Sequence, residues 1–140
     1  MNRLLASDKI YISNSKIKGA GRGVFANRII KKGEVVESCP VVEVSSNDSA
    51  LLVDSALISY FYFLGKKKER AVLVLGFGSI YNHSHRPNAV YKERLGEGVV
   101  EFVSQREIKK DQEITVNYNP ENLNEKTPLW FRKSEKQLQG

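Results

Sequence analysis

The most informative stretch of the chain is LGFGSIYNHSHRPNA, residues 75–89. It begins at the end of AVLVL, residues 71–75, which is the most apolar strand-like segment of the sequence. Polar groups beside a buried strand need hydrogen-bond partners, and a bound ligand is one way to supply them. Alternatively, Asn82, His83 and Asn88 hold a tight loop together through side-chain to backbone bonds. These residues alone favour neither interpretation.

Short strand-like segments lie on both sides of this stretch. They are rich in Val, Ile, Tyr and Phe, and Gly, Asn, Pro or Lys separate them, as in an all-β domain. The segments are KIYIS (9–13), GVFA (23–26), EVVES (34–38), VVEV (41–44), AVLVL (71–75), GVVEFVS (98–104) and EITVNY (113–118). The sequence therefore predicts a mainly β protein.

One segment differs from the strand pattern. SALISYFYFLG, residues 55–65, is almost continuously apolar, and Asn47, Asp48 and Ser49 precede it as residues that favour a helix start. We expect one short helix here, or a passage from helix to strand.

The composition is that of one compact domain. The chain has 140 residues, of which 41% are hydrophobic, and a chain of this size buries roughly two thirds of its unfolded surface in a single core. One cysteine, Cys39, and two histidines fall short of a structural zinc site, so no metal is expected. No apolar run is long enough for a bilayer and no leader pattern is present, which predicts a soluble, intracellular protein without a membrane partner.

The formal net charge is +6, from 22 Lys and Arg against 16 Asp and Glu. The excess lies in KKG (31–33), KKKER (66–70) and FRKSEK (131–136). Such runs are usually solvated faces, and a weak attraction to nucleic acid is the alternative. A dedicated nucleic-acid-binding domain would interleave aromatic residues with the lysines, which KKKER does not.

A glycine-rich turn precedes the second predicted strand. Gly19, Gly21 and Gly23 alternate in KGAGRGVFA, residues 18–26, where they permit positive φ and a close approach of the backbone to a ligand. A simple β-turn between two strands explains the same residues. A dinucleotide-binding fingerprint is not expected, because strand-like residues follow and not a helix.

The glycine turn, the NHS..PN loop and the EITVNY strand occur in the order found in a known family. Together they resemble the SET domains, whose hallmarks are a GxG near the start, an NHSxxPN segment and an ExxxxY strand. The matching stretches are GAGRGVFA (19–26), GEVVE (33–37), LGFGSIYNHSHRPNA (75–89) and QEITVNY (112–118). The resemblance runs from about Lys9 to about Phe131. It is closest in style to the minimal viral and bacterial members, which lack pre-SET regions and cysteine-rich post-SET segments.

The resemblance implies the SET-domain (β-clip) fold. This fold has several small curved sheets, one short helix and a knot-like threading of the C-terminal strand past the NHS loop, an exception to the rule against threaded connections. We expect a single domain over residues 1–140. Its core would span about 9–119, and residues 120–140 would form a post-SET-like tail without zinc cysteines.

The resemblance also implies a protein-lysine N-methyltransferase that uses S-adenosylmethionine, releases S-adenosylhomocysteine and needs no metal. An aromatic residue after the last strand commonly covers the adenine in this family, and Trp130 is the candidate, although it could equally be a core aromatic. The expected cofactor-binding residues are Gly21, Arg22, Gly23, Tyr81, Asn82, His83 and Trp130.

The expected catalytic residues are Tyr118, at the centre of a lysine channel, and Tyr60. Tyr62 is a less favoured alternative to Tyr60. Tyr91 and Val116 are expected to line the substrate channel, because some family members carry a tyrosine at the offset of Tyr91, where it limits the number of methyl groups added.

The expected partner is a protein with an accessible lysine, such as a histone or another basic chromatin protein. Glu37, Glu43, Asp48 and Asp54 are the acids that could attract such a substrate. The resemblance to minimal viral members also predicts a homodimer. The compartment would be the cytoplasm, or the host nucleus or a non-classical secretion route if the source is a virus or an intracellular bacterium. The competing function is a non-catalytic β-clip binding module, in which Tyr118 would be structural.

Overall fold

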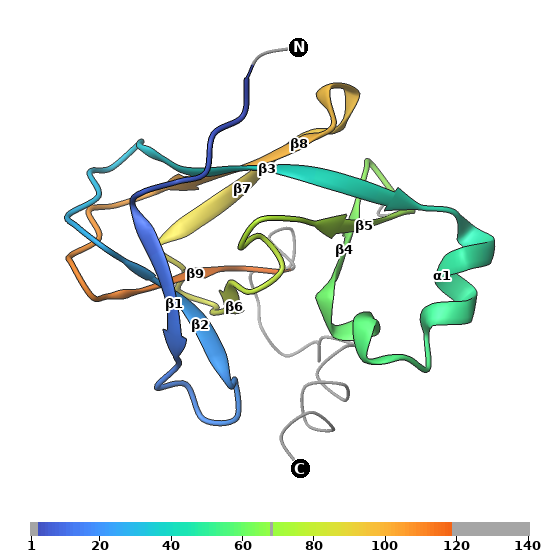
Figure 1. Ribbon diagram of the computed structural model, residues 1–140, viewed down its shortest axis with the longest axis horizontal. Helices are drawn as coiled ribbons and strands as arrows, with labels where there is room; N and C mark the ends of the chain where they lie inside the picture. Colours follow the sequence, from blue (N-terminus) through green and yellow to red (C-terminus); the bar gives the residue numbers. More distant parts are fainter. Residues whose placement is uncertain (1–2, 68, 119–140) are drawn as a thin grey trace.

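The computed structural model describes residues 3–67 and 69–118, and it is mainly β (Figure 1). The strands are β1 Ile10–Asn14, β2 Arg22–Ala26, β3 Val35–Val44, β4 Phe61–Leu64, β5 Arg70–Val74, β6 Asn82–His83, β7 Ala89–Arg94, β8 Val99–Ser104 and β9 Glu113–Val116. The helices are α1 Ser46–Leu52 and the short 3-10 helices Ala56–Tyr60 and Leu95–Glu97. The predicted mainly β architecture with one short α-helix is confirmed.

The strands form two small sheets. One has the order β1-β2-β9-β6 and the other the order β4-β5-β3-β8-β7. All pairs are antiparallel except β6 and β9, where Asn82 lies opposite Thr115 and His83 opposite Val116. This parallel pair brings the loop of residues 75–89 against the last described strand, which is what the resemblance implied for these two segments.

Strand β3 joins the two segments that the sequence suggested as separate strands, and Pro40 lies where they meet. Before Pro40 the strand pairs with β8, and after it with β5. Proline has no N–H to donate, so it is tolerated where a strand changes partners. The carbonyl of Pro40 still accepts from Leu75 N at 2.9 Å.

The α-helix lies upstream of the segment predicted for it. It begins after Ser45, whose hydroxyl accepts from Asp48 N at 3.1 Å, a normal N-cap arrangement. Residues 55–65 instead form a 3-10 turn followed by β4, in agreement with the helix-to-strand alternative. Aromatic residues in β4 favour a strand because they pair with β5, with Phe61 opposite Leu73.

The hydrophobic core lies between the two sheets and is filled from both. Fully buried side chains come from β2, β3, β5, β8 and β9, and Phe102 stacks on Tyr81 with ring centroids 4.2 Å apart. Within residues 3–67 and 69–118, no helix is both long and apolar enough to cross a bilayer.

Candidate active site

Asn82 connects three strands at the centre of the site. Its side-chain amide donates to the carbonyl of Arg22 at 2.9 Å and to Oε2 of Glu113 at 2.8 Å. The other oxygen of Glu113 accepts from the hydroxyl of Ser15 at 2.6 Å. A Cβ on Gly23 would lie 2.3 Å from Glu113 Oε2, so glycine is required there for these groups to meet. Asn82 therefore holds β2, β6 and β9 together.

Asn88 supports β9 in a second way. It is 3% exposed, its amide donates to the carbonyl of Glu113 at 2.8 Å, and its oxygen accepts from Thr115 N at 2.9 Å. The side chain thus acts toward β9 as a neighbouring strand would. Loop stitching, one of the two interpretations of this motif, holds for Asn88.

A cavity of about 540 Å³ adjoins the Asn82 cluster. Its lining comes from the glycine turn before β2, the end of the first 3-10 helix, the loop before β6, and Tyr118, which follows β9. The lining residues are Gly19, Ala20, Gly21, Arg22, Ser59, Tyr60, Ser79, Ile80, Asn82 and Tyr118. Asn82 therefore belongs both to a stitched loop and to a ligand-sized cavity, so the two interpretations of the motif do not exclude each other.

Tyr118 also belongs to a second group of side chains, which we call the tyrosine cluster: Tyr62, Tyr91 and Tyr118. The ring of Tyr62 meets those of Tyr91 and Tyr118 edge-on, with centroids 5.1 and 5.9 Å apart. The hydroxyl of Tyr91 donates to the carbonyl of Tyr118 at 3.2 Å, and the hydroxyl of Tyr118 donates to the carbonyl of Tyr81. Tyr118 is thus the one residue shared by the cavity lining and the cluster.

The buried hydroxyls near the cluster are held neutral. Burial raises the pKa of Tyr62 well above its usual value, and the neighbouring Tyr118 and Tyr91 add to this. Burial, followed by the charge of Glu37, likewise raises the pKa of Tyr81. Tyr62 donates to the carbonyl of Gly78 at 2.8 Å. These two tyrosines can orient neighbouring groups but cannot act as bases near neutral pH.

Glu37, on β3, anchors the loop before β6 through two hydrogen bonds. Its carboxylate accepts from Phe77 N and from the hydroxyl of Tyr81, both at 2.9 Å. It is 8% exposed, so the expectation that it attracts a basic substrate is wrong. Glu43, also expected to attract substrate, is held by Arg70 in a two-point ion pair at 2.6 Å.

His83 positions the backbone that carries Tyr118. Its Nδ1 accepts from Tyr118 N at 3.0 Å, so the ring proton lies on Nε2, which faces His85. His83 is not among the residues that line the cavity.

The structure separates the predicted site residues into groups. Those lining the cavity are Gly21, Arg22, Tyr60, Asn82 and Tyr118, and those adjoining it behind this lining are Gly23, Tyr81 and His83.

The remaining predicted site residues lie elsewhere. Tyr91 belongs to the tyrosine cluster, and Val116 is fully buried in the core, away from the cavity lining. Trp130 lies outside the described residues.

Sequence reasoning missed several residues of the site, among them Glu113, Glu37 and Ser59. Glu113 is the second residue of the QEITVNY motif, so its position was visible although its bond to Asn82 was not. Glu37 ends GEVVE in the same way. Ser59 carried no signal; its hydroxyl is buried, lines the cavity and has no hydrogen-bond partner among the described residues.

Two other kinds of centre, a metal site and a cysteine nucleophile, find no support in the described part of the chain. It contains no group of three His, Cys, Asp or Glu side chains arranged to hold a metal ion. Burial, followed by the charge of Glu37, raises the pKa of the Cys39 thiol far above its ordinary value, so Cys39 is not a thiolate nucleophile.

The model of the SET domain family matches residues 21–119, which include the glycine turn, the Asn82 cluster and Tyr118. The chain belongs to the SET domain family. A curated relative from Schizosaccharomyces pombe, named histone-lysine N-methyltransferase, H3 lysine-37 specific, is 27% identical over 111 residues, covering 79% of this chain and 70% of the relative. By its name, this relative is a lysine methyltransferase, and this chain shares the SET domain family with the matched model.

Solved structures have a fold similar to that of this SET domain. A candidate histone methyltransferase from Plasmodium falciparum superposes with a TM-score of 0.63 at 33% identity, covering 81% of this SET domain and 95% of that chain. A chain of the ctPRC2 complex, solved in an autoinhibited conformation bound to S-adenosylmethionine, has a TM-score of 0.67 at 19% identity over 94% of this chain and 17% of its own. The latter shows the fold alone. The predicted SET-type fold is confirmed.

Proposed function

We propose that this SET domain transfers a methyl group from S-adenosylmethionine to a lysine side chain of a protein. The observation that supports this most strongly is the position of Tyr118, where a ligand-sized cavity meets a cluster of tyrosines. A methyl donor in the cavity and a lysine among the tyrosines would meet at this residue. A non-catalytic binding module would have no use for this arrangement.

The cavity fits the proposed cofactor. Its volume lies within the roughly 300–1,000 Å³ typical of small-ligand pockets. Both amide protons of Asn82 are engaged within the protein, so its oxygen remains to accept from the ammonium group of the cofactor. The hydroxyl of Ser59, which has no partner among residues 3–67 and 69–118, and the backbone of Gly21 offer further polar contacts. When bound, S-adenosylmethionine supplies a sulfonium methyl group that an amine displaces directly.

The protein's contribution is alignment and desolvation. A lysine is normally charged at neutral pH, with a pKa of about 10.4, and only its neutral form is nucleophilic. Aromatic surroundings such as the tyrosine cluster disfavour the charged form. Because the proton of the Tyr118 hydroxyl is directed to Tyr81, the oxygen offers only lone pairs to the reaction. It can accept from the amine or from a methyl C–H, and so orient either group.

Several finer points belong to the same proposal. The domain would include the tail over residues 120–140, with Trp130 covering the adenine. Tyr60 would contribute to the site from the cavity wall. The name of the fission-yeast relative favours histone H3 as a substrate class. Homodimerisation and the compartment stay predictions.

The test is direct. The purified chain is incubated with S-adenosylmethionine and recombinant core histones, and the products are analysed by mass spectrometry. We expect lysine residues that gain the mass of one or more methyl groups, and none in reactions without S-adenosylmethionine. Tight cofactor binding with no methylation of histones or of other basic proteins would favour the binding-module alternative.

Asn82→Ala should weaken S-adenosylmethionine binding at least about tenfold, because a lost hydrogen bond to a charged group costs roughly 1.5–3 kcal/mol. Isothermal titration calorimetry measures this. The matched control is Asn27→Ala, just beyond the other end of β2, where the exposed amide makes one bond to Asp8 O at 3.3 Å. The control should bind as the parent does. Equal affinity of Asn82→Ala and the parent would show that the cofactor site is assigned wrongly.

A further inference from the structure

Two segments far apart in the sequence form matching turns. They are NRIIKKGE, residues 27–34, and QREIKKDQ, residues 105–112. Ile30 and Ile108 form an isolated antiparallel bridge between them, with both N–H···O bonds at 2.8 Å. Figure 1 shows the two segments together at the left edge of the molecule, where β2 leads to β3 and β8 leads to β9.

The hydrogen bonds across the bridge also occur in equivalent pairs. Gly33 N donates to Ser104 O at 2.9 Å, and in the equivalent position Asp111 N donates to Ala26 O at 2.7 Å. Both donors have positive φ, 84° for Gly33 and 68° for Asp111. The two segments are therefore related by a local two-fold arrangement.

Inside each turn the same contact recurs. Lys31 N donates to the side chain of Glu34 at 2.6 Å, and Lys109 N donates to the side chain of Gln112 at 3.0 Å. Each turn is closed by a backbone hydrogen bond of 3.1 Å. Glu34 N donates to Lys31 O in the first turn, and Gln112 N donates to Lys109 O in the second. Each turn thus presents a pair of adjacent lysines at its corner, one pair on each side of the bridge.

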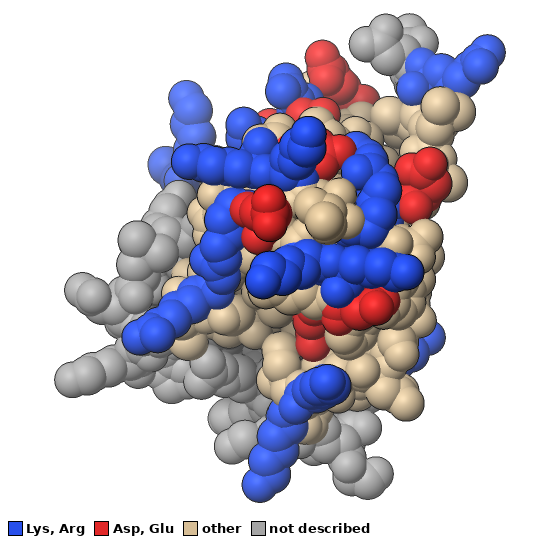
Figure 2. Space-filling view, turned by 90° about the vertical axis from the view of Figure 1, so that its left-hand side faces the viewer, with Lys and Arg blue, Asp and Glu red and all other residues tan. Residues whose placement is uncertain are grey.

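The surface formed by residues 27–34 and 105–112, which we call the paired-turn surface, is strongly basic. It carries six basic and three acidic residues, while the net charge of the whole chain is +6. Figure 2 shows Lys and Arg spread over this side of the molecule, with Asp and Glu interspersed among them. Its four corner lysines, Lys31, Lys32, Lys109 and Lys110, are all exposed.

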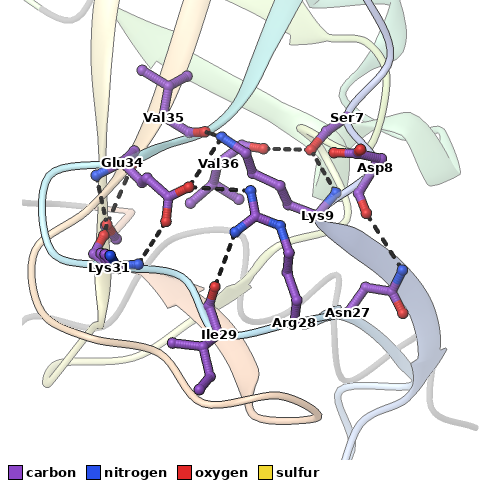
Figure 3. Close-up of polar contacts among 11 residues, drawn as sticks. Ser7, Asp8, Lys9, Asn27, Arg28, Ile29, Lys31, Glu34, Val35 and Val36 are labelled. Carbon is purple, nitrogen blue, oxygen red and sulfur yellow. Dashed lines mark hydrogen bonds and ion pairs between the residues drawn. The ribbon is translucent and has the colours of Figure 1, made fainter.

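The one acid of the first turn, Glu34, does not form an ion pair with these lysines. Glu34 is engaged by Arg28 at 3.2 Å and by Lys9 at 3.5 Å, as Figure 3 shows, and by the Lys31 backbone. Hydrogen bonding to that backbone N–H is the main cause that lowers the pKa of Glu34, with Arg28 adding to it. Among the described carboxylates, none forms an ion pair with the side chain of a corner lysine.

We infer that the paired-turn surface binds the phosphate backbone of a nucleic-acid duplex. Neither turn contains an aromatic residue, so the surface lacks the stacking platforms that single strands require. Exposed lysines without acidic partners suit phosphates, because each phosphate contact releases bound counterions. The two-fold arrangement of the lysine pairs also suits the antiparallel backbones of a duplex.

This surface lies apart from the cavity but is connected to it by two strands. β2 begins beside the cavity, at Arg22, and ends at the first turn, while β9 begins at the second turn and leads toward Tyr118. At about 3.3 Å per residue, either strand spans roughly 15 Å. A duplex bound to the turns would leave the cavity free, so the domain could hold a nucleic acid while modifying a protein carried on it.

The inference is tested by fluorescence anisotropy with a labelled 20-base-pair DNA duplex of arbitrary sequence over a salt series. The variant Lys32→Gln/Lys110→Gln removes one lysine from each turn. Each lost phosphate contact makes the negative slope of log K against log salt shallower by about 0.9. We therefore expect a slope shallower by about 1.8 and roughly 60-fold weaker binding at 0.1 M salt. Because both side chains are exposed, urea unfolding should be unchanged.

The matched control is Lys66→Gln/Lys67→Gln, which removes the same charge from exposed lysines in the turn between β4 and β5. It should keep most of the parent affinity. Equal losses in both variants would show that only the net charge matters, and duplex binding too weak to measure at 0.05 M salt would also overturn the inference. So would competition by polyglutamate as strong as that by unlabelled duplex, which would indicate an acidic protein as the partner. None of these outcomes depends on methyl transfer.

Discussion

Tyr118→Phe is expected to lower kcat for lysine methylation by about a hundredfold or more, because displacing reacting groups by about 1 Å costs that much when alignment carries the rate. The hydroxyl lost is the one bound to the carbonyl of Tyr81, beside the cavity. Loss of one hydrogen bond should reduce the free energy of unfolding by only about 1 kcal/mol. Steady-state kinetics, cofactor titration and urea unfolding of the same preparation separate the two effects.

Tyr91→Phe is the matched control for this experiment. Its hydroxyl also donates to a backbone carbonyl, that of Tyr118, and its ring lies in the same cluster, but Tyr91 does not line the cavity. A similar loss of stability is therefore expected with turnover retained, and with additional methyl groups on the product by mass spectrometry. If Tyr118→Phe methylates at the parent rate with normal cofactor binding, Tyr118 is a structural residue.

Glu37→Ala should destabilise the fold by roughly 3 kcal/mol or more. The substitution leaves the buried hydroxyl of Tyr81 and the partly buried N–H of Phe77 without their acceptor, and an unsatisfied buried group costs about 1–3 kcal/mol. It also leaves an empty space next to Gly76 in the loop before β6. A Cβ added to Gly76 would lie 2.5 Å from the carboxylate of Glu37. Urea unfolding followed by circular dichroism measures the loss.

Glu43→Ala provides the comparison within the same strand. Glu43 pairs with Arg70 at the surface, where more than a third of each side chain is exposed to solvent. Such exposed pairs contribute little to the free energy of unfolding, so a much smaller loss is expected than for Glu37→Ala. If both variants lose equal stability, Glu37 is not the anchor of the loop.

The sequence predicted the strands well where the apolar pattern was local. β1, β2, β5, β8 and β9 all lie at the predicted places to within a few residues. β6 and β7 were not predicted, because β6 is only two residues long and the apolar residues of β7 give way to the charged KER at 92–94. The helix was placed too late because the apolar density of residues 55–65 outweighed the capping signal of Ser45.

The site was predicted through family motifs, and the motifs did not predict how its side chains are arranged. Asn82 and Tyr118, which the motifs singled out, both line the cavity, and their roles stay predictions. The motifs did not distinguish lining residues from supporting ones such as Tyr81. Tyr62, ranked below Tyr60, packs against both other members of the tyrosine cluster, whereas Tyr60 lines the cavity. Which of two residues, two positions apart, faces a given neighbour depends on the path of the chain after the 3-10 turn, and no local pattern shows that path.

The central position of β9 also bears on how the protein acquires its activity. Ser15 and Glu113, which bond to each other in the Asn82 cluster, are 98 positions apart, and β9 inserts between β2 and β6. Contacts of such long range form slowly, because the loop between them must close first. During synthesis, β1 and β2 emerge long before β9, so the cavity wall cannot be complete until almost the last described residue has left the ribosome. Competence to bind a methyl donor would then report that the chain has been made and folded as far as Tyr118.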